Sequence, residues 1–246
     1  MANNTADYDF TIIVPVYNEI DNMEALEKRL GDYTKAAPVK TCVLFIDDGS
    51  SDGSADALKE ICNRNPDLYY AALKRNTGLT GALKAGIELS ESPLTGYIDA
   101  DLQTAPEDFN LLLPLMSQCE LAMGIRAARK DSGFKKLQSK IANGFRRSMT
   151  GDKATDTGCP LKIMKTDYAK KLPLFNGMHR FLPALFALQN GRVEEVPVRH
   201  FPRTAGKSKY HLWNRLAGPL IDCFAYRWMR KRQLNPITEA TDLNQS

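Results

Sequence analysis

The chain has 246 residues, of which 43% are hydrophobic and 25% charged, a composition that suits a folded domain and excludes an intrinsically disordered chain. Its formal net charge of +4 is too small to require a nucleic-acid partner, and we expect none. The five cysteines are scattered without a CxxC pair, which argues against a disulfide framework or a zinc site and favours a reducing compartment.

The first half of the chain alternates between strands and helices. Continuous apolar runs predict strands buried on both faces at residues 10–16, 41–48, 68–73, 94–101 and 121–126. The patterns between them predict helices that end near Ala36, cover 51–62 and 78–89, and begin again near Pro106. This alternation predicts an α/β fold, with a mostly parallel central sheet and helices on both faces.

The regular alternation of strands and helices ends after Arg126, and we expect an elaborated C-terminal half there. The pattern predicts a basic helix within 130–149, a short strand at 158–165, a helix at 178–190 with Pro183 near its start, and a strand at 192–201. A last helix is predicted from about 208 to 232, before a polar tail at 233–246 that we expect to be flexible. We therefore expect a single domain over residues 1–232.

Polar clusters follow three of the predicted strands. They are YNE at 17–19, DDGS at 47–50 and DADLQ at 99–103. In an open α/β sheet, ligands bind at the carboxyl ends of the strands. If the three strands are neighbours, the clusters converge on one crevice.

The DADLQ cluster places Asp99 and Asp101 two residues apart, with Gln103 after the same interval. The two carboxylates repel each other, and a divalent cation such as Mg²⁺ or Mn²⁺ can hold both while it keeps positions for phosphates and water. The alternative is a solvated loop that caps the next helix, which a lone Asp-x-Asp pattern would favour. The two further clusters at equivalent strand ends favour the metal site.

The DDGSSDGS stretch at 47–54 suits contact with a nucleoside. Carboxylates at Asp47 and Asp48 can accept hydrogen bonds from a base edge or a ribose, and Gly49 permits a tight turn. The same residues also fit an Asx turn and a helix cap, and both interpretations can hold together. Arg75, after the third strand, is either a base or phosphate contact or a surface cation.

Six motifs, taken in order, resemble the family 2 glycosyltransferases of the GT-A fold. They are PVYNE at 15–19, DDGSSDGS at 47–54, RNTGLTGALKAGI at 75–87, DADLQTAPED at 99–108, GIR at 124–126 and VPVRHFPRTAGKSKY at 196–210. The most similar branch contains dolichol-phosphate mannose synthase and the bacterial polyprenyl-phosphate glycosyltransferases. The resemblance covers residues 10–215 and implies a Rossmann-like GT-A sheet.

The resemblance also implies roles for individual residues. The metal ligands would be Asp99, Asp101 and Gln103. The donor would contact Pro15, Tyr17, Glu19, Asp47, Asp48, Arg75, Asp99, Lys207 and Ser208. The acceptor phosphate would meet Arg126 and Lys140, and Asp101, Arg126 and Arg203 would be catalytic. Two departures stand out, because the branch usually has an arginine near position 140 and an S-G-F-R motif where this chain has DTGCPLK at 156–162.

We therefore expect an inverting glycosyltransferase that needs Mg²⁺ or Mn²⁺ and moves one sugar from a GDP- or UDP-linked donor to a polyprenyl phosphate. Such an acceptor is already an anion, so it needs positioning rather than a base. One alternative is transfer to a glycan hydroxyl, with Asp108 as the base. A nucleotidyltransferase is disfavoured because no glycine-rich loop follows the first strand, and a sugar-nucleotide-binding module without turnover is the non-enzymatic alternative.

The last predicted helix has a broad apolar face that ends in basic residues. One row holds Leu212, Leu216, Leu220, Phe224 and Trp228, a second holds Trp213, Ala217, Ile221 and Ala225, and Arg230, Lys231 and Arg232 follow. Such a helix lies in a membrane interface or packs against its own domain. The sequence shows no signal-peptide pattern and no run of roughly 18 apolar residues. We expect a cytoplasmic protein on the inner face of the membrane, held there by this helix, by a separate small membrane protein, or by both.

Overall fold

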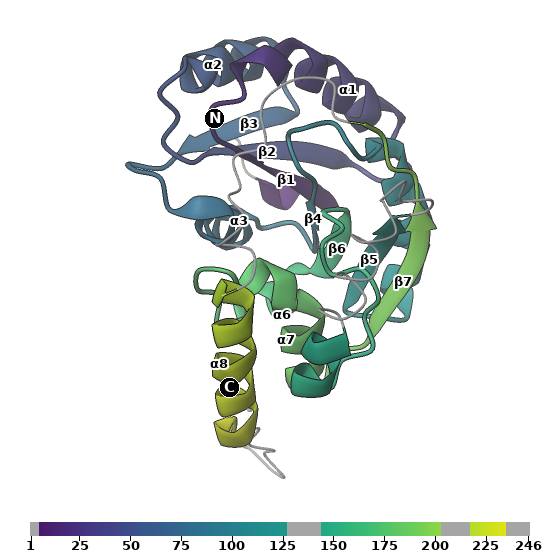
Figure 1. Ribbon diagram of the computed structural model, residues 1–246. Coiled ribbons are helices and arrows are strands. Elements are labelled where there is room, and N and C mark those ends of the chain that lie inside the picture. Colours follow the sequence, from purple (N-terminus) through teal and green to yellow (C-terminus); the bar gives the residue numbers. More distant parts are fainter. Residues whose placement is uncertain (1–4, 127–143, 203–216, 235–246) are drawn as a thin grey trace, which may run out of the picture.

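The computed structural model describes residues 5–126, 144–202 and 217–234, which build a layered α/β structure around a seven-stranded sheet (Figure 1). The strands are β1 (Phe10–Val16), β2 (Thr41–Asp47), β3 (Leu68–Ala72), β4 (Leu94–Tyr97), β5 (Leu121–Arg126), β6 (Lys162–Lys165) and β7 (Val193–Val198). Their order across the sheet is β3-β2-β1-β4-β6-β5-β7.

Helices connect most of these strands. They are α1 (Met23–Ala36), α2 (Ser54–Arg64), α3 (Gly78–Leu89), α4 (Phe109–Leu112), α6 (Thr166–Lys170), α7 (Leu182–Leu188) and α8 (Ala217–Arg232), and residues 144–150 are also helical. Short 3-10 helices are η1 (Thr5–Asp7), η2 (Ile20–Asn22), η3 (Pro106–Asp108), η4 (Leu113–Ser117) and η5 (Met178–Phe181). Among the described helices, none is both long and apolar enough to cross a bilayer.

The sheet is mostly parallel, as the sequence predicts. Parallel pairing joins β3 to β2, β2 to β1, β1 to β4 and β5 to β7. The exception is β6, which runs antiparallel between β4 and β5. Its first residue, Lys162, pairs with Tyr97 of β4 and with Met123 of β5. Lys162 therefore lies at the edge of the sheet where β4 and β5 end.

Helices cover both faces of the sheet, which explains the unbroken apolar strands. Ile12 and Val14 of β1 pack into one buried cluster with residues of α1 and α2, whereas Ile13 packs into a second cluster with residues of α3 and α7. Successive strand residues point to opposite faces, so a strand covered twice needs apolar residues at every position. Figure 1 shows α1 and α2 on one side and α3, α6 and α7 on the other.

Several predicted elements have different bounds in the structure. Strand β4 ends at Tyr97, not at 101, because the chain turns at the acidic cluster. The helix predicted from Pro106 is broken into η3, α4 and η4, and Pro114 lies at the start of η4. The strand predicted at 158–165 begins only at Lys162. The helix predicted at 178–190 consists of η5 and α7 and ends at Leu188.

Candidate active site

Strands β2, β1 and β4 are neighbours, so the loops that follow them lie together at one edge of the sheet. The loops after β1 and β2 are joined by hydrogen bonds. The amides of Asn18 and Glu19 donate to the hydroxyls of Ser50 (2.9 Å) and Ser54 (3.0 Å), and the Ser51 amide donates to the Asn18 side chain (2.8 Å). The serines of the DDGSSDGS motif therefore fix the loop that carries Tyr17 and Glu19.

Asp48 fixes the start of α3. One of its buried carboxylate oxygens accepts hydrogen bonds from the amide (2.7 Å) and hydroxyl (2.8 Å) of Thr77, and the other accepts from the Gly78 amide (2.8 Å). Gly49 makes this approach possible, because its φ is +72° and a Cβ there would lie 2.8 Å from the Asn76 amide nitrogen. In the structure, Asp48 therefore positions the loop that carries Arg75.

Asp47 is the last residue of β2, and its carboxylate is buried. Both of its oxygens lie close to the Ser50 amide, at 3.3 and 3.2 Å. Among the described residues, one hydrogen-bond donor contacts the Asp47 carboxylate, whereas three donors contact the Asp48 carboxylate. Asp47 is thus the more suitable of the two for an incoming base or ribose, and Arg75 is exposed nearby after β3.

Asp99 and Asp101 lie on the turn after β4. Leu102 has a φ of 57°, a left-handed conformation that costs a leucine about 1–2 kcal/mol, and its side chain packs in the core. The Asp101 carboxylate accepts a hydrogen bond from the Gln103 amide (3.1 Å). Backbone strain of this kind concentrates at functional sites. Here it ends the strand and leaves both carboxylates at the sheet edge.

The segment after β7 is held against this turn. The Phe201 amide donates to the Gln103 carbonyl (2.8 Å), and the Gln103 side-chain amide donates to the Phe201 carbonyl (3.3 Å). The chain thus reaches Pro202 beside the acidic turn. Four of the predicted site residues lie outside the described residues: Lys140, Arg203, Lys207 and Ser208.

The acidic turn needs positive charge. Burial, and after it the negative charge of Asp101, raise the pKa of Asp99 to about 6. The Tyr97 hydroxyl, which donates to Asp99 at 2.5 Å, and the cations Lys162 and Arg126 act in the opposite direction. A carboxylate that is crowded by a second carboxylate gains most from a bound cation.

The residues at this turn fit a divalent metal ion. Asp99 and Asp101 offer carboxylate oxygens and Gln103 an amide oxygen, the ligands that Mg²⁺ and Mn²⁺ prefer. Within the described ranges, no group of three or more His, Cys, Asp or Glu side chains could enclose a metal. Two carboxylates and one amide oxygen fill only part of the octahedral shell that Mg²⁺ prefers, so a cation held by these residues would keep positions for water and for a substrate diphosphate.

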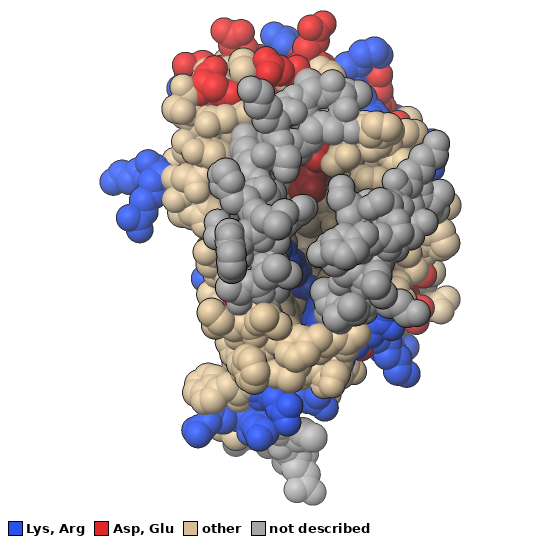
Figure 2. Space-filling model, viewed as in Figure 1, with Lys and Arg blue, Asp and Glu red and all other residues tan. Residues whose placement is uncertain are grey.

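Arg126 ends β5 and forms a fork with Asp156. Its Nε and Nη2 donate to the two carboxylate oxygens at 2.8 and 2.7 Å, and its amide donates at 3.1 Å. Burial alone would lower the pKa of this guanidinium, but the ion pair with Asp156 outweighs burial and holds the pKa above its ordinary value. Arg126 is a permanent cation at the same sheet edge as Asp99. Figure 2 shows acidic atoms and, below them, basic atoms in the middle of this face.

Comparison with known proteins identifies the family. The family model for glycosyl transferase family 2 matches residues 11–172. The chain belongs to glycosyl transferase family 2. Dodecaprenyl-phosphate galacturonate synthase of Rhizobium johnstonii is 31% identical over 93% of this chain and 69% of its own length. Undecaprenyl-phosphate 4-deoxy-4-formamido-L-arabinose transferase of Edwardsiella ictaluri is 34% identical over 82% of this chain and 63% of its own length. The chain is a glycosyltransferase. It spans about two thirds of the length of these relatives.

Solved structures confirm the GT-A fold. A mannosyltransferase from Pyrobaculum calidifontis, solved with GDP-Man and Mn²⁺, superimposes with a TM-score of 0.66 at 21% identity, over 93% of this chain and 66% of that one. Glucosyl-3-phosphoglycerate synthase from Mycobacterium tuberculosis, solved with Mn²⁺, uridine-diphosphate-glucose and phosphoglyceric acid, gives 0.64 at 12% identity, over 93% and 82%. These likenesses confirm the sequence-based expectation of fold.

A hydroxyl acceptor would need Asp108 as its base. In this glycosyltransferase, the Asp108 carboxylate accepts hydrogen bonds from Arg199. One buried carboxylate oxygen accepts from the Arg199 amide (2.7 Å) and the other from its Nε (2.7 Å). Arg199 also lies 3.6 Å from Glu107. The contacts make Asp108 an anchor for the segment between β7 and Phe201.

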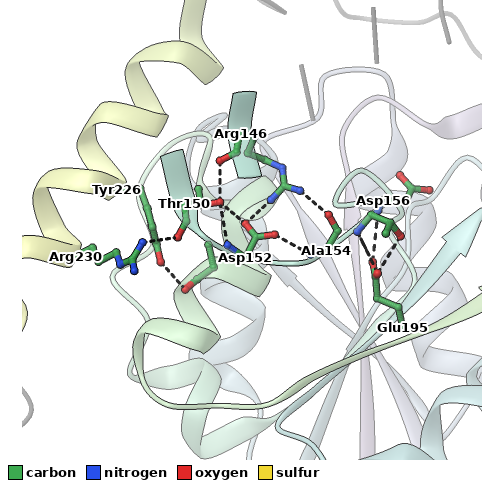
Figure 3. Close-up of polar contacts among 10 residues, drawn as sticks. Arg146, Thr150, Asp152, Ala154, Asp156, Glu195, Tyr226 and Arg230 are labelled. Atoms are coloured by element: carbon green, nitrogen blue, oxygen red, sulfur yellow. Dashed lines mark hydrogen bonds and ion pairs between the residues drawn. The ribbon is translucent and has the colours of Figure 1, made fainter. Parts of the chain in front are cut away.

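A buried polar network supports the segment that carries Asp156 (Figure 3). Arg146 forms an ion pair with Asp152 and donates to the Ala154 carbonyl at 2.7 Å. Asp152 also accepts from the Thr150 hydroxyl (2.5 Å) and from the Ala154 amide (2.9 Å). Further on, Glu195 of β7 accepts from the amide and hydroxyl of Thr155. The network fixes the backbone on both sides of Ala154, just before Asp156.

The sequence analysis missed two residues of this site. Asp156 binds Arg126, and Lys162 is buried at the start of β6 beside Tyr97. The available signal was the DTGCPLK stretch itself, in which an acid and a lysine flank a short apolar run. Only the antiparallel pairing of β6 between β4 and β5 brings both residues to the edge where the acidic turn lies.

Proposed function

We propose that this glycosyltransferase moves one sugar from a GDP- or UDP-linked donor to a polyprenyl phosphate, with inversion, at the cytoplasmic face of a membrane. The observation that carries the proposal is the common edge of the acidic turn and Arg126, which suits a reaction between a metal-bound diphosphate and a second phosphate. The relatives whose names specify transfer to dodecaprenyl or undecaprenyl phosphate support the acceptor class.

The donor half of the site lies over β1, β2 and β4. In this proposal, Asp47 contacts the base or ribose, with Pro15, Tyr17 and Glu19 beside it, and Asp48 and Arg75 complete the nucleoside side. A divalent cation held by Asp99, Asp101 and Gln103 would neutralise the leaving diphosphate. Arg203, Lys207 and Ser208, which follow Pro202 in the chain, would add donor contacts. The sugar then lies between the acidic turn and Arg126.

The acceptor half centres on Arg126, with Lys140 as a second cation. A guanidinium has five N–H groups, and two of those of Arg126 go to Asp156 in the side-chain fork. The others can bind a phosphate. An acceptor phosphate oxygen then bonds to the anomeric carbon from the side opposite the diphosphate, whose oxygen leaves with the bonding electrons. No proton has to move, because the acceptor is an anion from the start.

Transfer of label from a donor to lipid tests the proposal. Vesicles that contain undecaprenyl phosphate are incubated with radiolabelled GDP- and UDP-sugars and with Mg²⁺ or Mn²⁺, and the label is counted after solvent extraction. We expect label in the organic phase, and none with a chelator. Asp101→Ala should lose transfer by at least a thousandfold, about 4 kcal/mol of transition-state stabilisation, while Asp56→Ala on exposed α2 keeps it.

Three outcomes would contradict the proposal. Undiminished transfer by Asp101→Ala would refute the metal site. Label in a glycan but not in lipid would favour a hydroxyl acceptor. Tight binding of a nucleotide sugar with neither transfer nor hydrolysis would favour a binding module.

We further propose that α8 holds the enzyme on an anionic membrane. Its outer face exposes Ile221 (68%), Phe224 (61%) and Trp228 (61%), while Cys223 and Tyr226 on the opposite face are buried against the domain. Each large side chain contributes about 1.5–3 kcal/mol when fully buried, and each nearby cation adds about 1 kcal/mol on an anionic leaflet. The exposed row therefore suits the acyl boundary of a bilayer.

At the basic end of α8, we assign one cation to the protein and two to the membrane. Arg230 donates to the Thr150 carbonyl (3.2 Å), and Arg232 lies 5.4 Å from the centroid of the Trp228 ring. Lys231 and Arg232 are therefore the cations we assign to lipid.

Flotation with liposomes tests the membrane proposal. Wild type should float with phosphatidylglycerol vesicles, and less so at high salt. Ile221→Ser/Phe224→Ser/Trp228→Ser should remain in the aqueous fractions, whereas Leu111→Ser, which removes a 48% exposed leucine on α4, should float like wild type. Wild type that ignores vesicles would refute the role of α8 and favour a separate membrane subunit.

A further inference from the structure

Lys162 is the first residue of β6 and is only 1% exposed. Its ammonium nitrogen donates to the carbonyls of Cys159 and of Thr157 (3.4 Å). Among the described residues, no carboxylate oxygen lies within ion-pair distance of it. Burial lowers the pKa of the Lys162 ammonium, while Cys159, Asp156 and Asp99 act in the opposite direction and favour its charged form.

The surroundings of this ammonium lead to the acidic turn. It lies 5.7 Å from the centroid of the Tyr97 ring, its partner across the β4–β6 pairing. The hydroxyl of the same ring donates to Asp99 at 2.5 Å. Lys162 is thus buried close to Asp99, and its charge acts on that carboxylate through a buried medium in which charges interact strongly.

The same ammonium also shapes the segment that carries Asp156. Its two carbonyl partners come just after Asp156 in the chain, and Asp156 holds Arg126. One buried lysine therefore touches both halves of the site: the acidic turn through Tyr97, and the Arg126 fork through the segment at 157–159.

We propose that Lys162 is a positioning residue whose buried positive charge weakens the binding of a free divalent cation at Asp99 and Asp101, so that the cation binds tightly only together with a nucleoside diphosphate. The inference rests on the proposed metal site. A dication that approaches Asp99 is attracted by two carboxylates and repelled by the cation buried close to Asp99. The diphosphate of a nucleotide supplies the further negative charge that overcomes this repulsion.

Direct titration with Mn²⁺ tests the inference without any catalytic assay. Free Mn²⁺ is followed by electron paramagnetic resonance, with and without GDP or UDP. Lys162→Gln removes the charge and keeps a donor for one carbonyl, Lys162→Met removes both, and Lys162→Arg keeps the charge. We expect the two neutral variants to bind Mn²⁺ alone about fivefold tighter than wild type, with a smaller gap when nucleotide is present, and Lys162→Arg to resemble wild type.

Two controls separate charge from structure. Lys165→Gln, on the same strand but paired with Glu120 at 3.0 Å, should leave the affinity for Mn²⁺ unchanged. In an Asp99→Asn/Asp101→Asn background, Lys162→Gln should not restore Mn²⁺ binding, because both carboxylate ligands are gone. Thermal melts report which variants fold, and either neutral variant is sufficient for the comparison.

The outcomes distinguish this inference from the proposed function. If a folded neutral variant binds Mn²⁺ no tighter than wild type, the inference is overturned and Lys162 has only a structural role. If wild type binds no Mn²⁺ even with nucleotide, the proposed metal site itself fails. Tighter binding in the neutral variants, absent from the Asp99→Asn/Asp101→Asn background, supports the inference.

Discussion

Replacement of Asp152 should be among the most destabilising single changes outside the apolar core. The side chains of Asp152 and Arg146 are 4% and 9% exposed, and they form an ion pair (Figure 3). Asp152→Ala leaves the guanidinium buried without its counter-charge, and the loss of one partner from a buried pair costs about 3–5 kcal/mol. The Nε of Arg146 already lacks a hydrogen-bond partner within the described residues. That loss is a large fraction of the roughly 5–15 kcal/mol that typically stabilises a folded protein.

Urea unfolding followed by circular dichroism measures the effect. The midpoint should fall while the slope stays unchanged, since the same surface is exposed on unfolding. Asp32→Ala removes one partner of an exposed pair on α1 and should leave the midpoint unchanged. Arg146→Met/Asp152→Leu should recover part of the loss, because an apolar pair leaves no unpaired charge. A loss below about 1 kcal/mol for Asp152→Ala would show that the pair is solvated and refute the argument.

Three further predictions follow from single contacts. Burial lowers the pKa of His179 to about 3, so in the pH range above that value the unfolded state binds a proton that the folded state does not. The stability of the folded protein should therefore fall as the pH drops below about 6.5. Thermal melts of His179→Gln over the same pH range should show a flatter profile. Gly49→Ala should weaken both stability and nucleotide affinity in melts and titrations, whereas Gly144→Ala, with open space around its Cβ, should not. Asp108→Asn should lower the melting temperature yet keep transfer to lipid phosphate, and abolished transfer with an intact fold would revive the hydroxyl alternative.

Local sequence patterns were sufficient to predict most of the fold. The apolar runs predicted β1 and β5 to the residue, and the alternation with helices predicted the parallel pairing that brings the loops after β1, β2 and β4 together. The acidic turn follows from this, because parallel strands end at one edge. The amphipathic rows of α8 were also visible, but the sequence could not show that the row with Phe224 and Trp228 is exposed and not buried.

The features that the sequence did not predict depend on contacts between residues that are far apart in the chain. The role of Asp48 depends on Thr77, 29 residues away, and its carboxylate looked equally suited to a ribose. The burial of Lys162 depends on the insertion of β6 between β4 and β5, against the order of the chain. Such contacts join elements distant in sequence, and no periodicity or motif spacing predicts them. The pair of Arg126 with Asp156 was hidden for the same reason.

The contacts of Asp108 bear on the choice of acceptor. A hydroxyl nucleophile requires a base with an accessible lone pair, and the base must be within hydrogen-bond reach of the proton that it removes. Asp108 is buried, and each of its oxygens accepts a hydrogen bond from Arg199. To act as a base, it would have to release the anchor of the segment that leads to Phe201 and the acidic turn. A phosphate acceptor makes no such demand, because it needs only a cation, and Arg126 provides one at the same edge of the sheet.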